Sequence, residues 1–163
     1  MMDNIASLAS FGPEIILAGF IIVVILADLL PNVRKGALAL VAIGGLVTAL
    51  AAALGLYPDF LLKGTQELFL GLLAHDSFAI IFKIIFLLTA IVVALFSIPM
   101  LARWADGVGE YLALLLSCTL GMCLMASANN LLMMYLALEF VSISSYIMAG
   151  LLRHNRKSVE ASL

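Results

Sequence analysis

The chain has 163 residues, of which 65% are hydrophobic and only 11% are charged, with a formal net charge of −2. A soluble domain is about half apolar and about one quarter charged, so this composition excludes an ordinary water-soluble protein. A net charge this small also excludes recognition of nucleic acid through a basic surface. The sequence therefore predicts an integral membrane protein.

Five apolar segments follow one another along the chain, and each approaches the length of about 20 residues that a membrane-spanning helix needs. Proline residues mark the boundaries: Pro13 suits a first helical turn, Pro31 ends the first segment, and Pro58 and Pro99 follow later ones. The expected transmembrane helices cover about residues 13–30, 36–56, 77–98, 111–128 and 130–152. We expect an all-α bundle that forms one membrane domain over residues 1–163.

The longest connection, from Tyr57 to Asp76, is too short and too interrupted to cross a bilayer. A small strand or hairpin lying on one face of the membrane is expected there. In the second segment, Gly45, Ala49 and Ala53 recur every fourth residue and would let another helix approach closely. That helix could belong to a partner subunit or to this bundle.

Basic residues are distributed unevenly between the two ends of the expected helices. The connections after the first, third and fifth helices hold Arg34, Lys35, Arg103, Arg153, Arg156 and Lys157, whereas the opposite side has only Lys63 and Lys83. The positive-inside rule then places the N-terminus outside the cell and the connection after the fifth helix in the cytoplasm.

Glu139 lies near the middle of the fifth apolar segment. A carboxylate at this depth costs at least about 2.5 kcal/mol on insertion scales, and such groups usually mark ion or proton sites. Tyr135, Ser142 and Tyr146 follow steps of three and four residues around it, so all four share one helix face. This polar stripe could hold water and pass protons, or its groups could only form hydrogen bonds with neighbouring helices. We expect Glu139 to point into a bundle rather than into lipid.

The remaining lysine, histidine and cysteine side chains give weaker indications of a functional site. Lys83 could anchor its helix at the membrane interface or lie in a polar cavity, and neither position would put it at the depth of Glu139. His75 and His154 fall outside the apolar segments and are expected to be solvated, with no second ligand at metal-binding spacing. Cys118 and Cys123 are five residues apart, face different directions on a helix, and are expected to be small apolar side chains.

Three stretches of the chain resemble one family of membrane proteins. They are PEIIL at 13–17 with LAD at 26–28, LALEFVSISSY at 136–146, and KSVEASL at 157–163. The pattern Glu-x-x-Ser-x-x-x-Tyr in a membrane helix resembles the antiporter-like subunits of respiratory complex I, and the N subunits of NADH-quinone oxidoreductase most of all. The resemblance covers the whole chain. It implies the N-terminal part of a subunit with about fourteen helices.

The resemblance further implies a proton-translocating subunit of the membrane arm, located in the bacterial inner (plasma) membrane beside other complex I subunits. Glu139 would be the residue that translocates protons, and a lysine on a seventh helix, beyond Leu163, would be its partner. No cofactor or metal is expected on this chain, because NADH, flavin, iron–sulfur clusters and quinone would be bound elsewhere in the complex. The alternative is a subunit of a multi-subunit cation/proton antiporter, which shares the glutamate.

Overall fold

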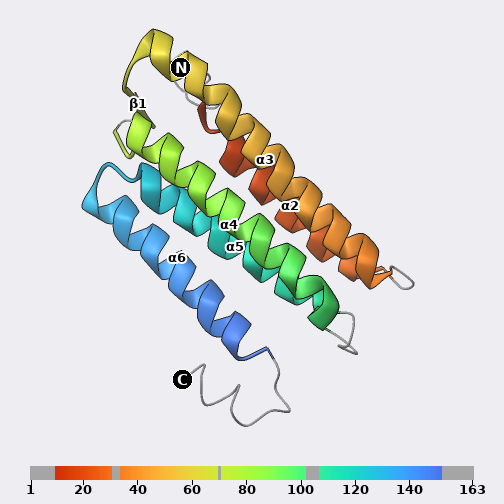
Figure 1. Cartoon of the computed structure of the whole chain (residues 1–163). Coiled ribbons are helices and arrows are strands. Elements are labelled where there is room, and N and C mark those ends of the chain that lie inside the picture. Colours follow the sequence, from red (N-terminus) through yellow and green to blue (C-terminus); the bar gives the residue numbers. More distant parts are fainter. Residues whose placement is uncertain (1–9, 31–33, 70, 102–106, 152–163) are drawn as a thin grey trace.

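The computed structural model describes residues 10–30, 34–69, 71–101 and 107–151. These residues form five helices and one hairpin of two short strands (Figure 1). The elements are α2 (Gly12–Asp28), α3 (Lys35–Lys63), β1 (Gln66–Leu68), β2 (Leu73–His75), α4 (Ser77–Leu101), α5 (Val108–Ser127) and α6 (Leu131–Ala149). The all-α fold expected from the apolar segments is confirmed.

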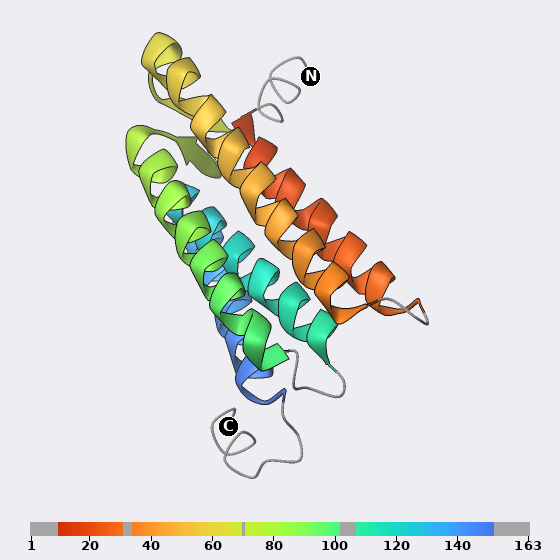
Figure 2. The same ribbon diagram turned by 45° about the vertical axis from the view of Figure 1, so that its right-hand side comes forward.

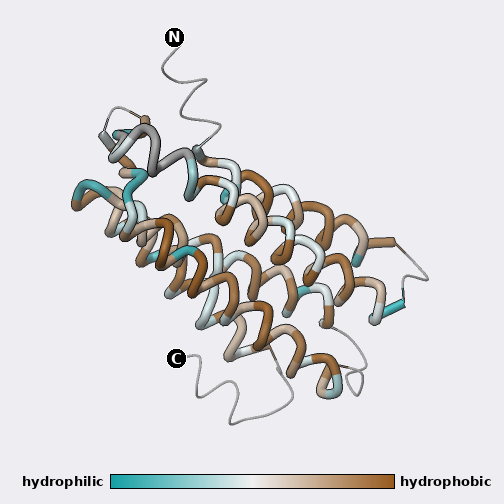
Figure 3. Tube along the Cα trace, turned by 45° about the horizontal axis from the view of Figure 1, so that its top comes forward, coloured by the Kyte–Doolittle hydropathy of each residue, from teal (hydrophilic) through white to brown (hydrophobic). Residues whose placement is uncertain are grey.

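Four of the described helices, α3 to α6, are each long and apolar enough to cross a membrane. The remaining helix, α2, has 17 residues and extends over about 25 Å, which is near the lower limit for a span. Hydrophobic residues follow the helices along their length, and hydrophilic residues gather mainly at their ends (Figure 3). The chain is therefore a multi-pass membrane protein.

The helices run side by side in alternating directions, with α5 at the centre of the contacts (Figures 1 and 2). Helix α2 packs on α3 and α5, α4 also packs on α3 and α5, and α6 packs chiefly on α5. The core between them contains Leu17 of α2, Leu46 of α3, Leu87 of α4 and Leu116 of α5, each fully buried. This arrangement leaves one side of α6 without a neighbouring helix among the described residues.

Two helices extend past the prolines that were expected to end them. Helix α3 continues through Pro58 to Lys63, and α4 continues through Pro99 to Leu101. A proline inside a helix removes one backbone hydrogen bond and crowds the preceding turn. Both proline rings are exposed and lie close to the ends of their helices, where the freed carbonyl can reach water or lipid headgroups.

The expected hairpin is confirmed and closes one end of the bundle, which we call the hairpin end. Its strands are antiparallel, with Gln66 paired to His75 and Leu68 paired to Leu73. The turn includes Gly71, whose φ of 83° favours glycine. The side chain of Asn129, in the turn between α5 and α6, donates a hydrogen bond of 3.2 Å to the Gly71 carbonyl. The Asn129 backbone N–H donates another, of 3.0 Å, to Leu72.

Small residues allow close approach between helices within this chain. A Cβ atom built on Gly45 of α3 would lie 2.5 Å from the Phe20 ring of α2, so no side chain fits there. Ala49 and Ala53, on the same face of α3, are buried in the core. Packing inside the bundle, rather than a partner subunit, therefore explains the small-residue spacing at Gly45.

Candidate functional site

The polar stripe of α6 lies on the side of the helix that faces away from α5. At about 100° per residue, Tyr135, Glu139, Ser142 and Tyr146 fall within a sector of about 60°. The buried residues of α6, Ala137 and Ser144, fall roughly opposite that sector. The continuous helix thus places the four polar residues together, on a face directed away from the other described helices.

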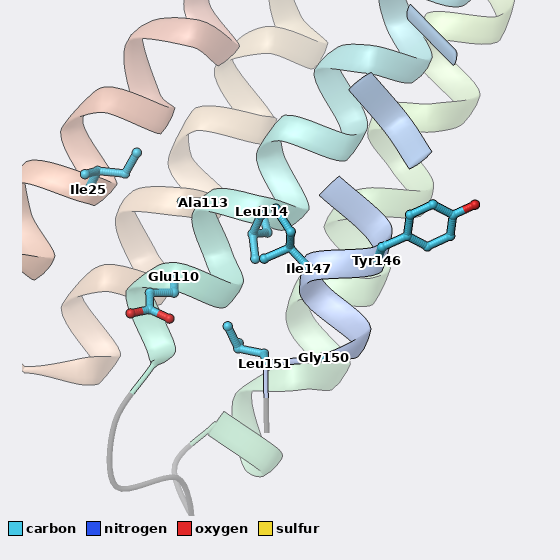
Figure 4. Close-up of a pocket in the computed structure, with 8 residues that line it drawn as sticks. All are labelled: Ile25, Glu110, Ala113, Leu114, Tyr146, Ile147, Gly150 and Leu151. Carbon is cyan, nitrogen blue, oxygen red and sulfur yellow. The ribbon is translucent and has the colours of Figure 1, made fainter. Parts of the chain in front are cut away.

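Exposure agrees with this geometry. The side chains of Tyr135 and Tyr146 are 61% and 59% exposed, and Glu139 and Ser142 are half-buried. The Tyr146 ring points away from the other labelled side chains in Figure 4. The expectation that Glu139 points into the bundle is therefore not met by the five helices described. The other described helices leave the stripe uncovered, and the expectation that a later helix of such a subunit would stand there stays a prediction.

The four polar groups are too widely spaced to form a direct proton path by themselves. Tyr135 and Tyr146 are eleven residues apart, which is about 16 Å along the helix axis. Among the described residues, no hydrogen bond joins any two of the four side chains, although nearby Ser144 and Ser145 donate to backbone carbonyls within α6. A path along this face would require water or polar groups from another protein surface.

A groove lies beside the stripe, at the opposite end of the bundle from the hairpin. It has a volume of about 560 Å³ and is lined mainly by apolar side chains of α2, α5 and α6 (Figure 4). Glu110, in the first turn of α5, contributes a carboxylate, and Tyr146 contributes part of one wall. The groove therefore lies between the ends of α2 and α6, beside the first turns of α5.

A buried ion pair, which the sequence did not predict, lies near the hairpin end. The Lys83 ammonium of α4 is 2.7 Å from a carboxylate oxygen of Glu14 in the first turn of α2, and the two side chains are 3% and 0% exposed. The interface-anchor interpretation of Lys83 is therefore wrong, and the polar-cavity alternative holds. Helix packing explains why, because Lys83 lies on the same α4 face as buried Ala79 and Leu87.

His75 was expected to be solvated, but it is only 2% exposed, and it lies at the end of β2 close to this ion pair. Neither ring nitrogen makes a hydrogen bond within the described residues. Burial, and next the positive charge of Lys83, lower the pKa of His75 below its usual value of 6.5, while Glu14 and Asp76 act in the opposite direction. The backbone carbonyl of Leu56 approaches the ring without completing a hydrogen bond, and it weakly favours the charged form. His75 is thus held mainly neutral near pH 7.

The two cysteines are free thiols, as expected, with Cys123 buried and Cys118 half-buried. Within the described ranges, no group of three His, Cys, Asp or Glu side chains is placed to hold a metal ion. His154 lies outside the described residues. The titratable chemistry that the structure does bring together is therefore the Glu14–Lys83–His75 cluster, and Glu139 remains separate on α6.

Comparison with known proteins identifies relatives of this chain. Residues 128–163 match the family described as NADH:quinone oxidoreductase/Mrp antiporter, TM. The chain is 39% identical, over 99% of its length, to NADH-quinone oxidoreductase subunit N of Anaeromyxobacter sp.. It is 36% identical, also over 99%, to NADH-quinone oxidoreductase subunit N 2 of Sorangium cellulosum. The chain belongs to the family of these N subunits.

The chain is also similar to NAD(P)H-quinone oxidoreductase subunit 2 of Synechocystis sp., with 34% identity over 99% of its length. The chain spans about a third of the length of these relatives, or 31%, 33% and 31% respectively. The segment that matches the family model contains all of α6, and so it contains Glu139 and the whole polar stripe. The Glu14–Lys83 pair lies outside that segment.

Breaking the buried ion pair should destabilise the bundle more than removing it. We expect Glu14→Gln and Lys83→Met each to lower the free energy of unfolding by about 3–5 kcal/mol, because each leaves one buried charge without its partner. The double variant should lose clearly less than the sum of the two. The measurement is unfolding of the chain in detergent by denaturant, followed by circular dichroism.

The matched control is Glu110→Gln, which removes an exposed carboxylate and should change the free energy of unfolding by no more than about 0.5 kcal/mol. Single variants at Glu14 and Lys83 that behaved like this control, or effects that simply added in the double variant, would contradict the importance of the pair.

Proposed function

We propose that this chain forms part of a proton-translocating membrane-arm subunit of NADH-quinone oxidoreductase, the respiratory complex I. One observation carries the proposal. The family-matched helix α6 holds a carboxylate within an apolar span, and the polar face around it is left open by the other four helices. Hydrocarbon does not satisfy such a face, so another protein surface with polar groups is the expected neighbour.

In this proposal Glu139 is the group that gains and loses a proton. A low-dielectric surrounding favours the protonated carboxyl, and a nearby cation favours the ionised form. Electron transfer elsewhere in the complex would move or change such a cation and so alter the proton affinity of Glu139. Tyr135, Ser142 and Tyr146 could donate and accept hydrogen bonds to water along the same face.

The chain would contribute to the enzyme without performing its redox chemistry. We propose that NADH, flavin, iron–sulfur clusters and quinone are bound by other parts of the complex. Its partners would be neighbouring membrane-arm subunits and the lipid of a bacterial inner membrane. The names of the relatives favour this complex over a cation/proton antiporter, although the matching family includes both kinds of protein.

Glu139→Gln tests the proposal in the full-length subunit within the assembled complex. The amide keeps the size and hydrogen bonding of the side chain but cannot release a proton. We expect the variant to lose most of the proton pumping coupled to NADH oxidation, measured in sealed membrane vesicles with a pH-sensitive dye. Glu110→Gln, which changes an exposed carboxylate at the start of α5, should retain normal pumping.

Assembly of the complex must be checked in the same membranes by native gel electrophoresis. Unchanged proton pumping by an intact Glu139→Gln complex would refute the role of this carboxylate. Loss of assembly in both Glu139→Gln and Glu139→Ala, with pumping normal in whatever complex forms, would instead show that the residue serves structure alone.

We further propose that the hairpin end faces the outside of the cell and the opposite end faces the cytoplasm. The excess of Arg and Lys in the connections at the opposite end supports this orientation. A single cysteine introduced at exposed Thr65, with Cys118 and Cys123 replaced by Ala, should react with a membrane-impermeant maleimide added to intact cells. A cysteine introduced at Arg34 should react only after the cells are opened. The reverse pattern would contradict the orientation.

A further inference from the structure

Three titratable side chains lie near one another at the hairpin end, away from the polar stripe on which the proposed function rests. Glu14 comes from α2, Lys83 from α4 and His75 from β2, and each is at most 3% exposed. Helices α2 and α4 both pack on α3 and α5 rather than chiefly on each other, so the long Lys83 side chain bridges them. Burying ionisable side chains costs free energy of desolvation. Such clusters are therefore candidates for functional sites.

The cluster has hydrogen-bonding capacity that the described residues do not use. Within the described part of the chain, neither oxygen of Glu14 has a hydrogen-bond partner apart from the Lys83 ammonium. Both nitrogens of His75 and the Ser127 hydroxyl lack a partner there as well. A neutral imidazole can accept one proton, and a carboxylate can accept hydrogen bonds at both oxygens. The cluster can therefore bind a proton and polar molecules such as water.

We propose that Glu14, Lys83 and His75 form a proton-binding site at the hairpin end, in which His75 gains and loses the proton and the ion pair sets its affinity. Binding adds one proton from the aqueous phase to an imidazole nitrogen. The net charge of the three side chains then changes from zero to +1. His75 belongs to β2, which lies outside the candidate membrane-spanning helices.

Groups on every neighbouring element define the affinity of the site. Lys83 on α4 opposes the charged ring, whereas Glu14 on α2 and Asp76, just after β2, favour it. Asp76 also caps α4, since its carboxylate accepts a hydrogen bond of 2.7 Å from the Ala79 N–H. On α5, Cys123 is buried close enough to sense both Glu14 and Lys83, and on β1 the nearest acid, Glu67, is exposed. Of the charged groups near His75, Lys83 and Glu14 therefore have the two largest effects on its pKa, and these effects have opposite signs.

Nuclear magnetic resonance of the full chain, with isotope-labelled histidine and in lipid nanodiscs, tests the site directly. The sequence has only two histidines, so His75→Gln identifies the signal of each. His75 should titrate below 6.5, the usual value. Glu14→Gln should lower the pKa of His75 further, and Lys83→Met should raise it. The double variant should raise it less than Lys83→Met does, because the effect of Lys83 exceeds that of Glu14.

The His154 signal serves as the reference, and it should not respond to substitutions at Glu14 or Lys83. A His75 signal with an ordinary pKa that ignores both substitutions would overturn the proposal. A ring that stays neutral until the chain unfolds in acid would overturn it as well. Neither result depends on proton pumping, so the outcome is separate from the test of Glu139.

Stability provides a second readout if a variant folds poorly. Because the pKa of His75 is lowered in the folded chain, the unfolded chain binds more protons below about pH 6.5, and stability falls as the pH decreases. His75→Gln should reduce the loss of thermal stability between about pH 8 and about pH 5. An unchanged loss in this variant would contradict proton binding at His75.

Discussion

A charge inside a membrane protein needs a polar partner, because hydrocarbon cannot solvate it. This chain meets that requirement in two different ways. Glu14 finds Lys83 at 2.7 Å inside the bundle, where both side chains are shielded from solvent. Glu139 finds no such partner among the described residues and lies on the open face of α6. The five described helices thus supply a partner for the charge of Glu14 but none for Glu139.

The packing of the helices explains this difference. Helix α5 contacts α2, α3, α4 and α6, and one pair of polar groups beside it, the Ser97 and Tyr111 hydroxyls 2.8 Å apart, is satisfied locally. Helix α6 packs on α5 through a narrow face, where Gly121 lets Val141 approach closely. A helix that buries only one narrow face keeps the rest of its surface free for contacts other than those with the described helices.

Hydropathy predicted the five helices, because an apolar segment of membrane length has few alternatives to a helix. The prolines were a poorer guide to the helix ends, since α3 continues past Pro58 and α4 past Pro99. The face shared by Glu139 and its neighbours could also be read from local spacing. The sequence did not reveal the Glu14–Lys83 pair or the burial of His75, since both depend on how α2, α4 and the hairpin meet in space. One local signal was available in the sequence, because helical spacing puts Lys83 on the same face as Ala79, Leu87 and Ala90. The structure shows that this face is buried.

The central claim is that the polar stripe of α6 faces protein and water rather than lipid. An experimental structure of the complete membrane arm, detailed enough to show ordered water, tests it most directly. The account predicts a basic side chain, or a chain of water molecules leading to one, within hydrogen-bonding reach of the Glu139 carboxyl. Lipid acyl chains packed against Glu139, with no polar group or water beside it, would contradict both the placement of the stripe and its proposed role in proton transfer.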